Sequence, residues 1–391
     1  MRSKVNRNRV VCLDWYETEE YMWMCLADRN AICKVNKETK EVTVLGHYPE
    51  TEYAQENLSF TVVRNGDKLV FLPYCADYVA IMDMNTEKLE FISIKKCDYK
   101  DYDRIGKFAT GFIKDEYVYM FGMWYPAIVR LNVDSAEMDY FYYKDCVEGT
   151  CTAPYSQLGC AQVDDELILA TGKKGYVIKY DVVQNKGELK RLANKEISFF
   201  GITKDEQHIW MTFEDIKEKT IGCWNVKTNK TKMIPIPDSG LYYPPVIYKE
   251  HLYLFPFEGT KVQVLDLRNG ECRMQEKISE LIVPGGEWAR IMAVKQRGDI
   301  IKFQTGGSRC WYEYDMKSSS LQEEYFEIDD IKFAYERKRK KKQEIEKAET
   351  DFAERQLLLT EYVQMIDRKM WSAQNDADGC GENIYQTLKR L

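Results

Sequence analysis

Short apolar runs alternate with polar turns along most of this chain. Runs such as KLVFLPY (68–74) and YVAIMDM (78–84) are rich in Val, Ile, Phe and Tyr and end at clusters of Gly, Asp and Asn. Such runs, bounded by turn-forming residues, are typical of strands joined in hairpins. The pattern therefore predicts an all-β body made of short antiparallel strands.

One turn recurs seven times. In DMNTEKLEF (83–91) an Asp opens a turn and an apolar strand follows, and an Asp or Asn side chain can stabilise such a turn by accepting a bond from a backbone N–H two residues on. The copies begin at Asn36, Asp83, Asn132, Asp181, Asn225, Asp266 and Asp315, with spacings of 47, 49, 49, 44, 41 and 49 residues. This period indicates a repeat protein whose units pack on their neighbours.

Each repeat divides into four strands, which we label A to D in chain order. The second repeat shows the division best, as LSFTVV (58–63), KLVFLPY (68–74), YVAIMDM (78–84) and KLEFISI (88–94). The sixth repeat divides in the same way, with HLYLFPF (251–257) as strand B and CRMQEKI (272–278) as strand D. Seven such units in tandem resemble a seven-bladed β-propeller, in which four-stranded blades surround a central channel.

The resemblance is to an architecture and covers about residues 9–328. The Gly-His and Trp-Asp signature of WD repeats and the paired glycines of kelch blades are absent. The chain looks more similar to uncharacterised propeller-like proteins of Gram-positive bacteria, which implies a link to surface-polysaccharide assembly. Blades one and seven each have four contiguous strands, so we expect closure by packing between them without an exchanged strand. An open solenoid of the same sheets is the structural alternative.

The composition changes after the propeller region, residues 1–330. The second region, residues 331–391, begins with a segment (331–371) that lacks Gly and Pro and is dense in charged residues, which predicts a long C-terminal α-helix. Apolar residues recur every seven positions at Ile345, Phe352, Leu359 and Ile366. This stripe could associate with a partner or a second copy, or could pack on the propeller itself. The six consecutive cations 337–342 are interpreted as a solvated helix face, and contact with anionic lipid or nucleic acid is the alternative.

The charge of the chain limits which partners are plausible, and its cysteine content indicates the cellular compartment. The net charge is −7, and since residues 331–391 carry +2, the remainder carries −9. An acidic body argues against nucleic acid as the partner. Twelve scattered cysteines without a CxxC pair suit buried, reduced thiols. The polar N-terminus and the lack of any run of about 18 apolar residues favour a cytoplasmic protein without a transmembrane segment.

Motifs for metal, cofactor or nucleophilic chemistry are lacking in the sequence. The three histidines are scattered, and no HExxH, GxSxG or P-loop pattern is present. We therefore expect no metal, no cofactor and no catalytic residue identifiable from sequence. Asp101 and Asp103, in the longer connection 95–107, are better candidates for catalysis than the carboxylates of the tight turns.

The two faces of the predicted propeller differ in their loops. Antiparallel strands place the A–B and C–D turns on one face and the B–C and D–A connections on the other. The aromatic loop residues lie on the second face, and Tyr and Trp suit contact with sugars, peptides or proteins. The residues predicted to bind a ligand there are Tyr102, Lys107, Tyr155, Gln157, Tyr243 and Trp288 near the channel mouth, with Trp124 and Tyr125 further out. The alternative is that these rings join neighbouring blades beneath the loops.

Two classes of function remain open. The favoured one is a non-catalytic binding or scaffold propeller that holds a glycan, peptide or protein on the aromatic face, with the C-terminal helix as a second contact. The other is a hydrolase or lyase acting on a glycan or small molecule at the same channel mouth. The fold supports both, and the missing acid/base and metal motifs favour binding.

Overall fold

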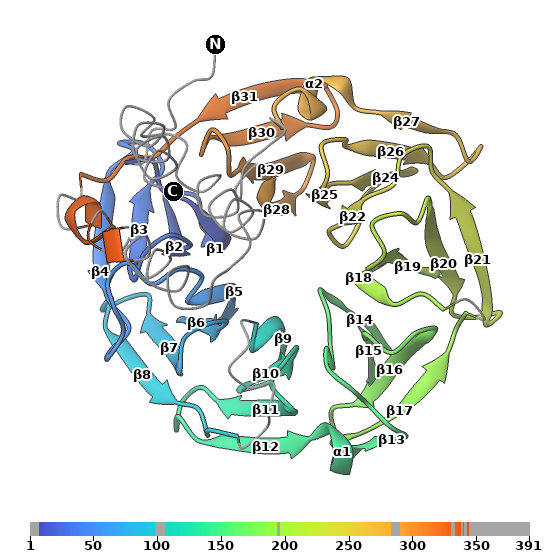
Figure 1. The fold of residues 1–391 in the computed structure, drawn as a ribbon, viewed down its shortest axis with the longest axis horizontal. Coiled ribbons are helices and arrows are strands. Elements are labelled where there is room, and N and C mark those ends of the chain that lie inside the picture. Colours follow the sequence, from blue (N-terminus) through green and yellow to red (C-terminus); the bar gives the residue numbers. More distant parts are fainter. Residues whose placement is uncertain are drawn as a thin grey trace, which may run out of the picture.

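Seven β-sheets, one for each blade, surround a central axis, as Figure 1 shows for the computed structural model of the chain, and a small two-stranded sheet is added to them. The structure describes residues 8–97, 106–193, 196–282, 290–329, 333–337, 339 and 342–343. In each blade the first strand lies nearest the axis and the fourth lies at the rim (Figure 1). The predicted all-β, seven-bladed propeller of four-stranded antiparallel blades is therefore confirmed.

Five blades are regular four-stranded meanders. Blades one to three consist of β1 (Cys12–Glu17), β2 (Tyr21–Leu26), β3 (Ile32–Asn36) and β4 (Val42–Gly46); β5 (Ser59–Asn65), β6 (Lys68–Pro73), β7 (Tyr78–Asp83) and β8 (Leu89–Ser93); and β9 (Phe108–Lys114), β10 (Tyr117–Gly122), β11 (Ala127–Asn132) and β12 (Met138–Tyr142). Blades five and seven consist of β18 (Phe199–Lys204), β19 (His208–Phe213), β20 (Thr220–Asn225) and β21 (Lys230–Pro235); and β28 (Ile291–Arg297), β29 (Ile300–Thr305), β30 (Trp311–Asp315) and β31 (Ser320–Glu324).

Blade four gains a fifth strand at its rim. Its meander consists of β14 (Cys160–Val163), β15 (Glu166–Ala170), β16 (Tyr176–Asp181) and β17 (Lys186–Arg191). The connection from blade three forms a one-turn helix, α1 (Tyr143–Cys146), and then β13 (Val147–Glu148), which pairs in parallel with β17. This addition covers part of an edge that would otherwise be open to pairing with another chain.

Blade six departs most from the predicted pattern. Its meander consists of β23 (Val246–Tyr248), β24 (His251–Leu254), β26 (Gln263–Asp266) and β27 (Cys272–Met274). The predicted strand HLYLFPF is divided, because the chain leaves the blade after Leu254 and forms β25 (Pro256–Glu258), which pairs with β22 (Leu241–Tyr242) near the axis. The predicted strand CRMQEKI was too long: it ends at Met274, and α2 (Glu276–Ser279) follows.

The repeated Asp or Asn acts in all seven C–D turns as predicted. Asp83 Oδ1, for example, accepts bonds from the backbone N–H groups of Asn85 (3.0 Å) and Thr86 (2.7 Å), and Asn36, Asn132, Asp181, Asn225, Asp266 and Asp315 accept equivalent bonds. The sequence pattern did not reveal a second shared feature. The residue four places after each Asp or Asn has a positive φ: Lys40, Glu87, Ala136, Asn185, Asn229, Gly270 and Ser319.

Hydrogen bonds join every pair of neighbouring blades close to the innermost strands. Going round the axis, they run from Val62 N to Asp14 Oδ2 (2.8 Å), Thr61 Oγ1 to Ala109 O (2.7 Å), Thr110 Oγ1 to Gln157 O (2.8 Å), Leu158 N to Phe200 O (2.8 Å), Thr212 Oγ1 to Tyr242 O (2.9 Å), Tyr243 Oη to Met292 O (2.8 Å) and Gln304 Nε2 to Val10 O (2.7 Å). These bonds satisfy polar groups between apolar blade faces, where an unpaired group would be costly.

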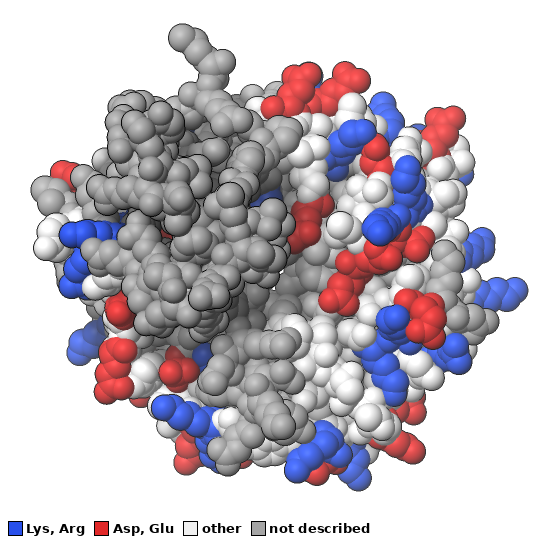
Figure 2. Space-filling model, in the orientation of Figure 1, with Lys and Arg blue, Asp and Glu red and all other residues white. Residues whose placement is uncertain are grey.

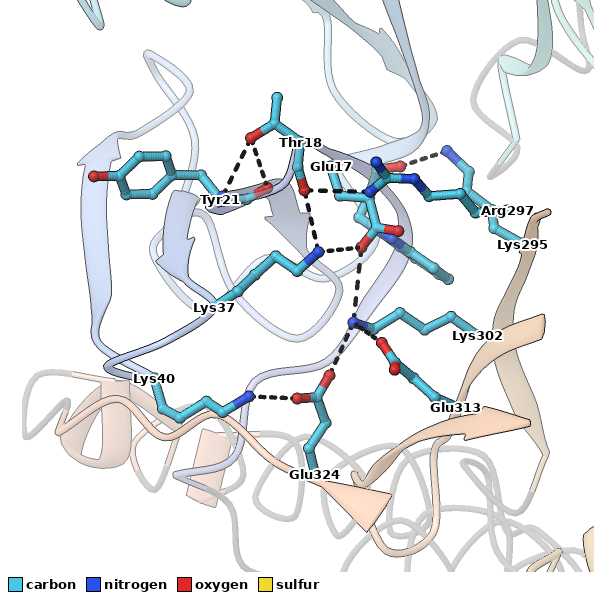
Figure 3. A network of polar contacts seen from close by, with 11 residues as sticks. Glu17, Thr18, Tyr21, Lys37, Lys40, Lys295, Arg297, Lys302, Glu313 and Glu324 are labelled. Carbon is cyan, nitrogen blue, oxygen red and sulfur yellow. Dashed lines mark hydrogen bonds and ion pairs between the residues drawn. The ribbon is translucent and has the colours of Figure 1, made fainter. Parts of the chain in front are cut away.

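Closure between blades seven and one combines apolar packing with a network of charged side chains. Lys302 is nearly buried and lies 2.8 Å from Glu324, 2.9 Å from Glu313 and 3.7 Å from Glu17 of blade one (Figure 3). Glu324 also pairs with Lys40 of blade one at 2.5 Å. We expected closure by packing without an exchanged strand, and β31 does belong to its own blade. The charged network was not predicted.

Main-chain bonds add to this closure. The backbone N–H of Val10 donates to Phe326 O (2.9 Å), and that of Ile328 donates to Asn8 O (2.8 Å). Phe326 and Ile328 are buried in a cluster with Val10, Cys12 and Trp15. The segment after the last strand therefore belongs to the core of blade one.

Only the beginning of the predicted C-terminal helix falls within the described residues. Residues 333–337 are helical, and the Phe333 ring lies on the guanidinium of Arg29 at 3.7 Å, so this part rests on blade one. The stripe Ile345, Phe352, Leu359 and Ile366 lies outside the described residues. In the described ranges the eleven cysteines are free, and no helix has both the length and the apolarity needed to cross a membrane.

Candidate functional site

An apolar ring lies around the axis where the innermost strands begin. Each blade contributes one side chain that is more than nine-tenths buried: Leu13, Phe60, Ala109, Leu158, Phe200, Tyr243 and Met292. Their burial shows that protein atoms cover these side chains, so they do not face an open, water-filled channel. The ring forms an apolar floor below the B–C and D–A connections.

Two aromatic residues from blades two and three stand on one side of this floor. Tyr74 directly follows β6, and its ring centre lies 5.1 Å from that of Phe60. Trp124 follows β10, and its backbone N–H donates to Gly106 O at 3.0 Å. A Cβ atom at Gly106 would lie 2.9 Å from Trp124 and 3.3 Å from Tyr74. The glycine therefore allows both rings to approach the backbone closely.

Blades six and seven provide the opposite side. Phe257, on the additional strand β25, lies 5.3 Å from Phe200 and 5.2 Å from Tyr243 between ring centres. The Arg290 guanidinium lies 4.7 Å from the Phe257 ring centre, and its Nε is shielded from solvent without a hydrogen-bond partner. Tyr74, Trp124 and Phe257 are each only partly buried, and all pack against the floor.

Electrostatic effects connect the two sides. Burial raises the pKa of the Tyr74 phenol, the Cys75 thiol adds to the rise, and the charge of Arg290 offsets part of it. Burial likewise raises the pKa of Tyr243, and Arg290 again offsets part of the rise. Arg290 therefore lies near both Tyr74 and Tyr243. The surface is hollowed around the axis (Figure 2). We call this region the mouth, and Tyr74, Trp124, Phe257 and Arg290 the mouth residues.

The predicted ligand-binding residues fall into three groups. Trp124 is partly exposed at the mouth. Tyr102 and Trp288 lie outside the described residues, as do Asp101, Asp103 and Glu287. The other five, namely Lys107, Tyr125, Tyr155, Gln157 and Tyr243, are more than nine-tenths buried.

Four of these five buried residues make contacts that join parts of the fold. Tyr125 donates its hydroxyl to Lys95 O (2.9 Å), and the Tyr155 ring stacks on Tyr143 at 4.9 Å. Lys107 pairs with Asp77 at 3.1 Å and also donates to the carbonyl oxygen of Cys75, which lies in the same loop as Asp77. Tyr243 donates to two carbonyls of blade seven. In these contacts the side chains join blades and loops, as the alternative interpretation of the aromatic face supposed.

Sequence reasoning did not select Tyr74 as a site residue and missed Phe257 and Arg290. Tyr74 and Phe257 are the last residues of the segments predicted as strand B of blades two and six. The Pro–Phe–Glu segment that follows HLYLF was the available signal, because proline is poorly tolerated inside a central strand. Arg290 carries no local signal, since its position depends on where β28 begins.

One carboxyl group lies on the B–C and D–A face, where blades four and five meet. Glu214 follows β19, and its backbone N–H donates to Ser198 O at 3.0 Å. Desolvation raises the pKa of Glu214, and the Ser198 and Gln157 side chains offset part of the rise. The pKa values of Asp28 and Glu324, by contrast, are shifted downward by the cations beside them. In the same ranges, no cluster of three or more His, Cys, Asp or Glu side chains could hold a metal ion.

Comparison with known proteins supports the fold. No protein-family model matches the chain, and no curated protein sequence matches it. A catalytically inactive variant of virginiamycin B lyase from Staphylococcus aureus, solved with quinupristin, is similar with a TM-score of 0.58 and 12% identity, over 79% of this chain and 96% of the lyase.

Two further solved structures show the same likeness in other settings. A chain of the mitotic checkpoint complex has a TM-score of 0.52 and 13% identity, over 83% of this chain and 88% of that one. PorZ, a surface component of the type-IX secretion system of Porphyromonas gingivalis, has a TM-score of 0.52 and 10% identity, over 83% of this chain and 39% of PorZ. At these identities the similarity shows a shared β-propeller fold.

Proposed function

We propose that the protein is a non-catalytic binding or scaffold propeller whose ligand occupies the channel mouth on the B–C and D–A face. One observation carries the proposal: the partly exposed rings of Tyr74, Trp124 and Phe257 stand over a buried apolar floor where all seven blades converge. Concave, mostly apolar sites with a few polar groups are the usual form of ligand sites.

The support beneath the mouth favours tight binding. The rings rest on residues that interblade hydrogen bonds and stacking hold in place, such as Tyr243 and Phe60. A rigid platform loses little conformational freedom when a ligand binds, so more of the contact energy appears as affinity. The buried residues among those predicted from the sequence, including Lys107, Tyr155 and Gln157, would serve this supporting role.

The chemistry of the mouth suits a glycan, a polar peptide, or a segment of a partner protein that presents an aromatic side chain. The fold itself occurs both in a macromolecular assembly and in a lyase, so it does not select among these ligands. The free cysteines of the described ranges are consistent with a reducing, cytoplasmic location, which we include in the proposal. The C-terminal region would provide a second contact with a partner.

The proposal is tested by removing mouth rings one at a time. We expect Trp124→Ala and Tyr74→Ala each to weaken binding of a ligand identified in a glycan and peptide screen by more than about 1 kcal/mol, the size that marks an important contact. Tyr117→Ala is the matched control, because Tyr117 is a partly buried aromatic at the opposite end of β10. Equal affinities for all three variants and the unchanged protein, with thermal melting confirming the fold, would refute the proposal.

Glu214 supports a second candidate function, a hydrolase or lyase at the same mouth. Desolvation raises the pKa of this carboxyl group above its ordinary value, and a raised pKa is one mark of a candidate general acid or base. If this is the function, Glu214→Gln should abolish turnover while leaving binding intact. The same variant should leave a purely binding protein unchanged in every assay.

A further inference from the structure

We propose that the mouth binds a small planar aromatic compound that carries a single carboxylate, with the carboxylate on Arg290 and the ring against Tyr74 and Trp124. This inference rests on the proposed function, because it names the ligand class of the same site. It goes beyond a general binding face because one residue, Arg290, fixes the charge of the ligand.

Arg290 lacks an acidic partner within the described part of the chain. Its side chain makes no hydrogen bond or ion pair to any described residue, and its Nε is shielded from solvent. A shielded donor without a partner is unfavourable, because it has lost its hydrogen bonds to water. The chain has 63 acidic and 56 basic residues, so acidic partners are plentiful. Other shielded arginines do have one: Arg29 and Arg309 lie 3.0 and 2.6 Å from Asp28.

The surroundings of Arg290 leave its donors available. The central carbon of the guanidinium lies 4.7 Å from the centre of the Phe257 ring, a cation–π contact in which no N–H group is paired with an oxygen or nitrogen acceptor. Those N–H groups form a planar fork that matches the two oxygens of a carboxylate. Phe257 therefore contacts the guanidinium without supplying an oxygen or nitrogen acceptor for its N–H groups.

The rest of the mouth favours an aromatic ring over a more highly charged ligand. Tyr74 and Trp124 offer flat apolar surface across the mouth from Phe257, above the apolar floor. Lys107, the other nearby cation, is committed to Asp77 and to the Cys75 carbonyl. Acidic side chains also lie near the hollow (Figure 2). One cation in such a setting can neutralise a carboxylate, whereas a phosphate dianion would remain half unpaired.

The test uses three probes with the same ring: 2-naphthoate, the neutral 2-naphthamide and 2-naphthyl phosphate. We expect calorimetric titration of the full chain to give the naphthoate an affinity about tenfold above that of the amide, equivalent to about 1.4 kcal/mol. The phosphate should bind no more tightly than the carboxylate. Arg290→Gln should remove the difference between acid and amide and leave amide binding unchanged. Arg273→Gln, which removes an exposed cation of the outer strand β27, is the control for net charge.

The outcomes separate this inference from the function on which it rests. Trp124→Ala should weaken the acid and the amide by the same factor, because both use the ring platform. If the acid and amide bind the unchanged protein equally, and both depend on Trp124, the carboxylate inference is overturned and the binding function stands. If no probe binds in a Trp124-dependent manner, both fail. The comparison between probes on the unchanged protein does not depend on the folding of any variant.

Discussion

At the residue scale, burial decides what each aromatic side chain can do. Tyr243 and Trp124 both follow from the same sequence signal, an aromatic residue in a B–C or D–A connection. The structure shows Tyr243 buried with its hydroxyl bonded to Ile291 O and Met292 O, whereas Trp124 remains partly exposed. The sequence cannot separate these cases, because the atoms that cover Tyr243 come from another blade. Hydrogen bonds within one turn depend only on neighbouring residues, so the Asp and Asn turns could be predicted directly from the sequence.

We expect Tyr243→Phe to lower the free energy of unfolding by about 1 kcal/mol, because the change deletes one hydroxyl and leaves two carbonyls short of a partner. Tyr243→Ala also creates a cavity and should cost about 3–5 kcal/mol, so reduced binding by that variant would not by itself show ligand contact. Denaturant unfolding measures both. Tyr117→Phe, which removes no hydrogen bond in the described structure, should leave stability unchanged. A larger loss for Tyr117→Phe than for Tyr243→Phe would contradict this account.

At the element scale, the C–D turn is the unit that the sequence specifies best. The positive φ within that turn, however, could not be predicted from the motif. The fifth residue of every turn has a positive φ, yet only one of the seven is Gly and two are Asn. The connections of blade six could not be predicted, because β22 and β25 pair with each other rather than with a neighbour in the meander. That ribbon carries Phe257 to the mouth, so the least predictable element contributes directly to the proposed site.

Equivalent turn positions in blades three and six allow opposite substitutions to be compared. Ala136 and Gly270 have φ values of 61° and 77°. A non-glycine residue with this geometry carries strain of about 1–2 kcal/mol, so Gly270→Ala should lower stability by about 1 kcal/mol. Ala136→Gly should raise stability by about 0.5 kcal/mol, since glycine relieves strain but loses more entropy on folding. Thermal melting measures both changes, and shifts of the same sign would show that the turns are not equivalent.

At the scale of the whole molecule, the propeller depends on how its ends meet. The number of blades could be predicted from the repeat spacing, because each blade repeats a local pattern. The closure could not, because it joins residues nearly 300 positions apart, as in the Gln304–Val10 bond. Lys302 and its three carboxylates concentrate charge at this seam, and removing the lysine would leave those carboxylates facing one another.

Lys302→Met should therefore lower the free energy of unfolding by about 3 kcal/mol, the usual scale for an uncompensated shielded charge. Lys68→Met is the control, because the exposed pair of Lys68 with Asp134 at 3.0 Å should contribute less than about 1 kcal/mol. Urea unfolding at neutral pH compares the two. Equal effects would mean that the seam network does not stabilise closure.

The same network predicts how stability depends on pH. Burial alone would raise the pKa of Glu324, but Lys302 and Lys40 outweigh it and leave the pKa below its ordinary value. A carboxylate with a lowered folded pKa stabilises the protein above its unfolded pKa of about 4.3, and that stabilisation is lost as pH falls through the folded value. Stability should therefore fall below about pH 4, and less steeply in Glu324→Gln. An identical acid limb in the variant would assign the loss to other groups.

The central claim is that a ligand binds at the mouth, and the most direct test observes Trp124 itself. The protein labelled with 5-fluorotryptophan gives a fluorine NMR signal for each of its eight tryptophans, and Trp124→Phe identifies the signal of interest. Addition of 2-naphthoate should shift the Trp124 signal and leave that of Trp15, which is buried at the seam between blades seven and one, unchanged. A saturating ligand that leaves the Trp124 signal in place would contradict the account.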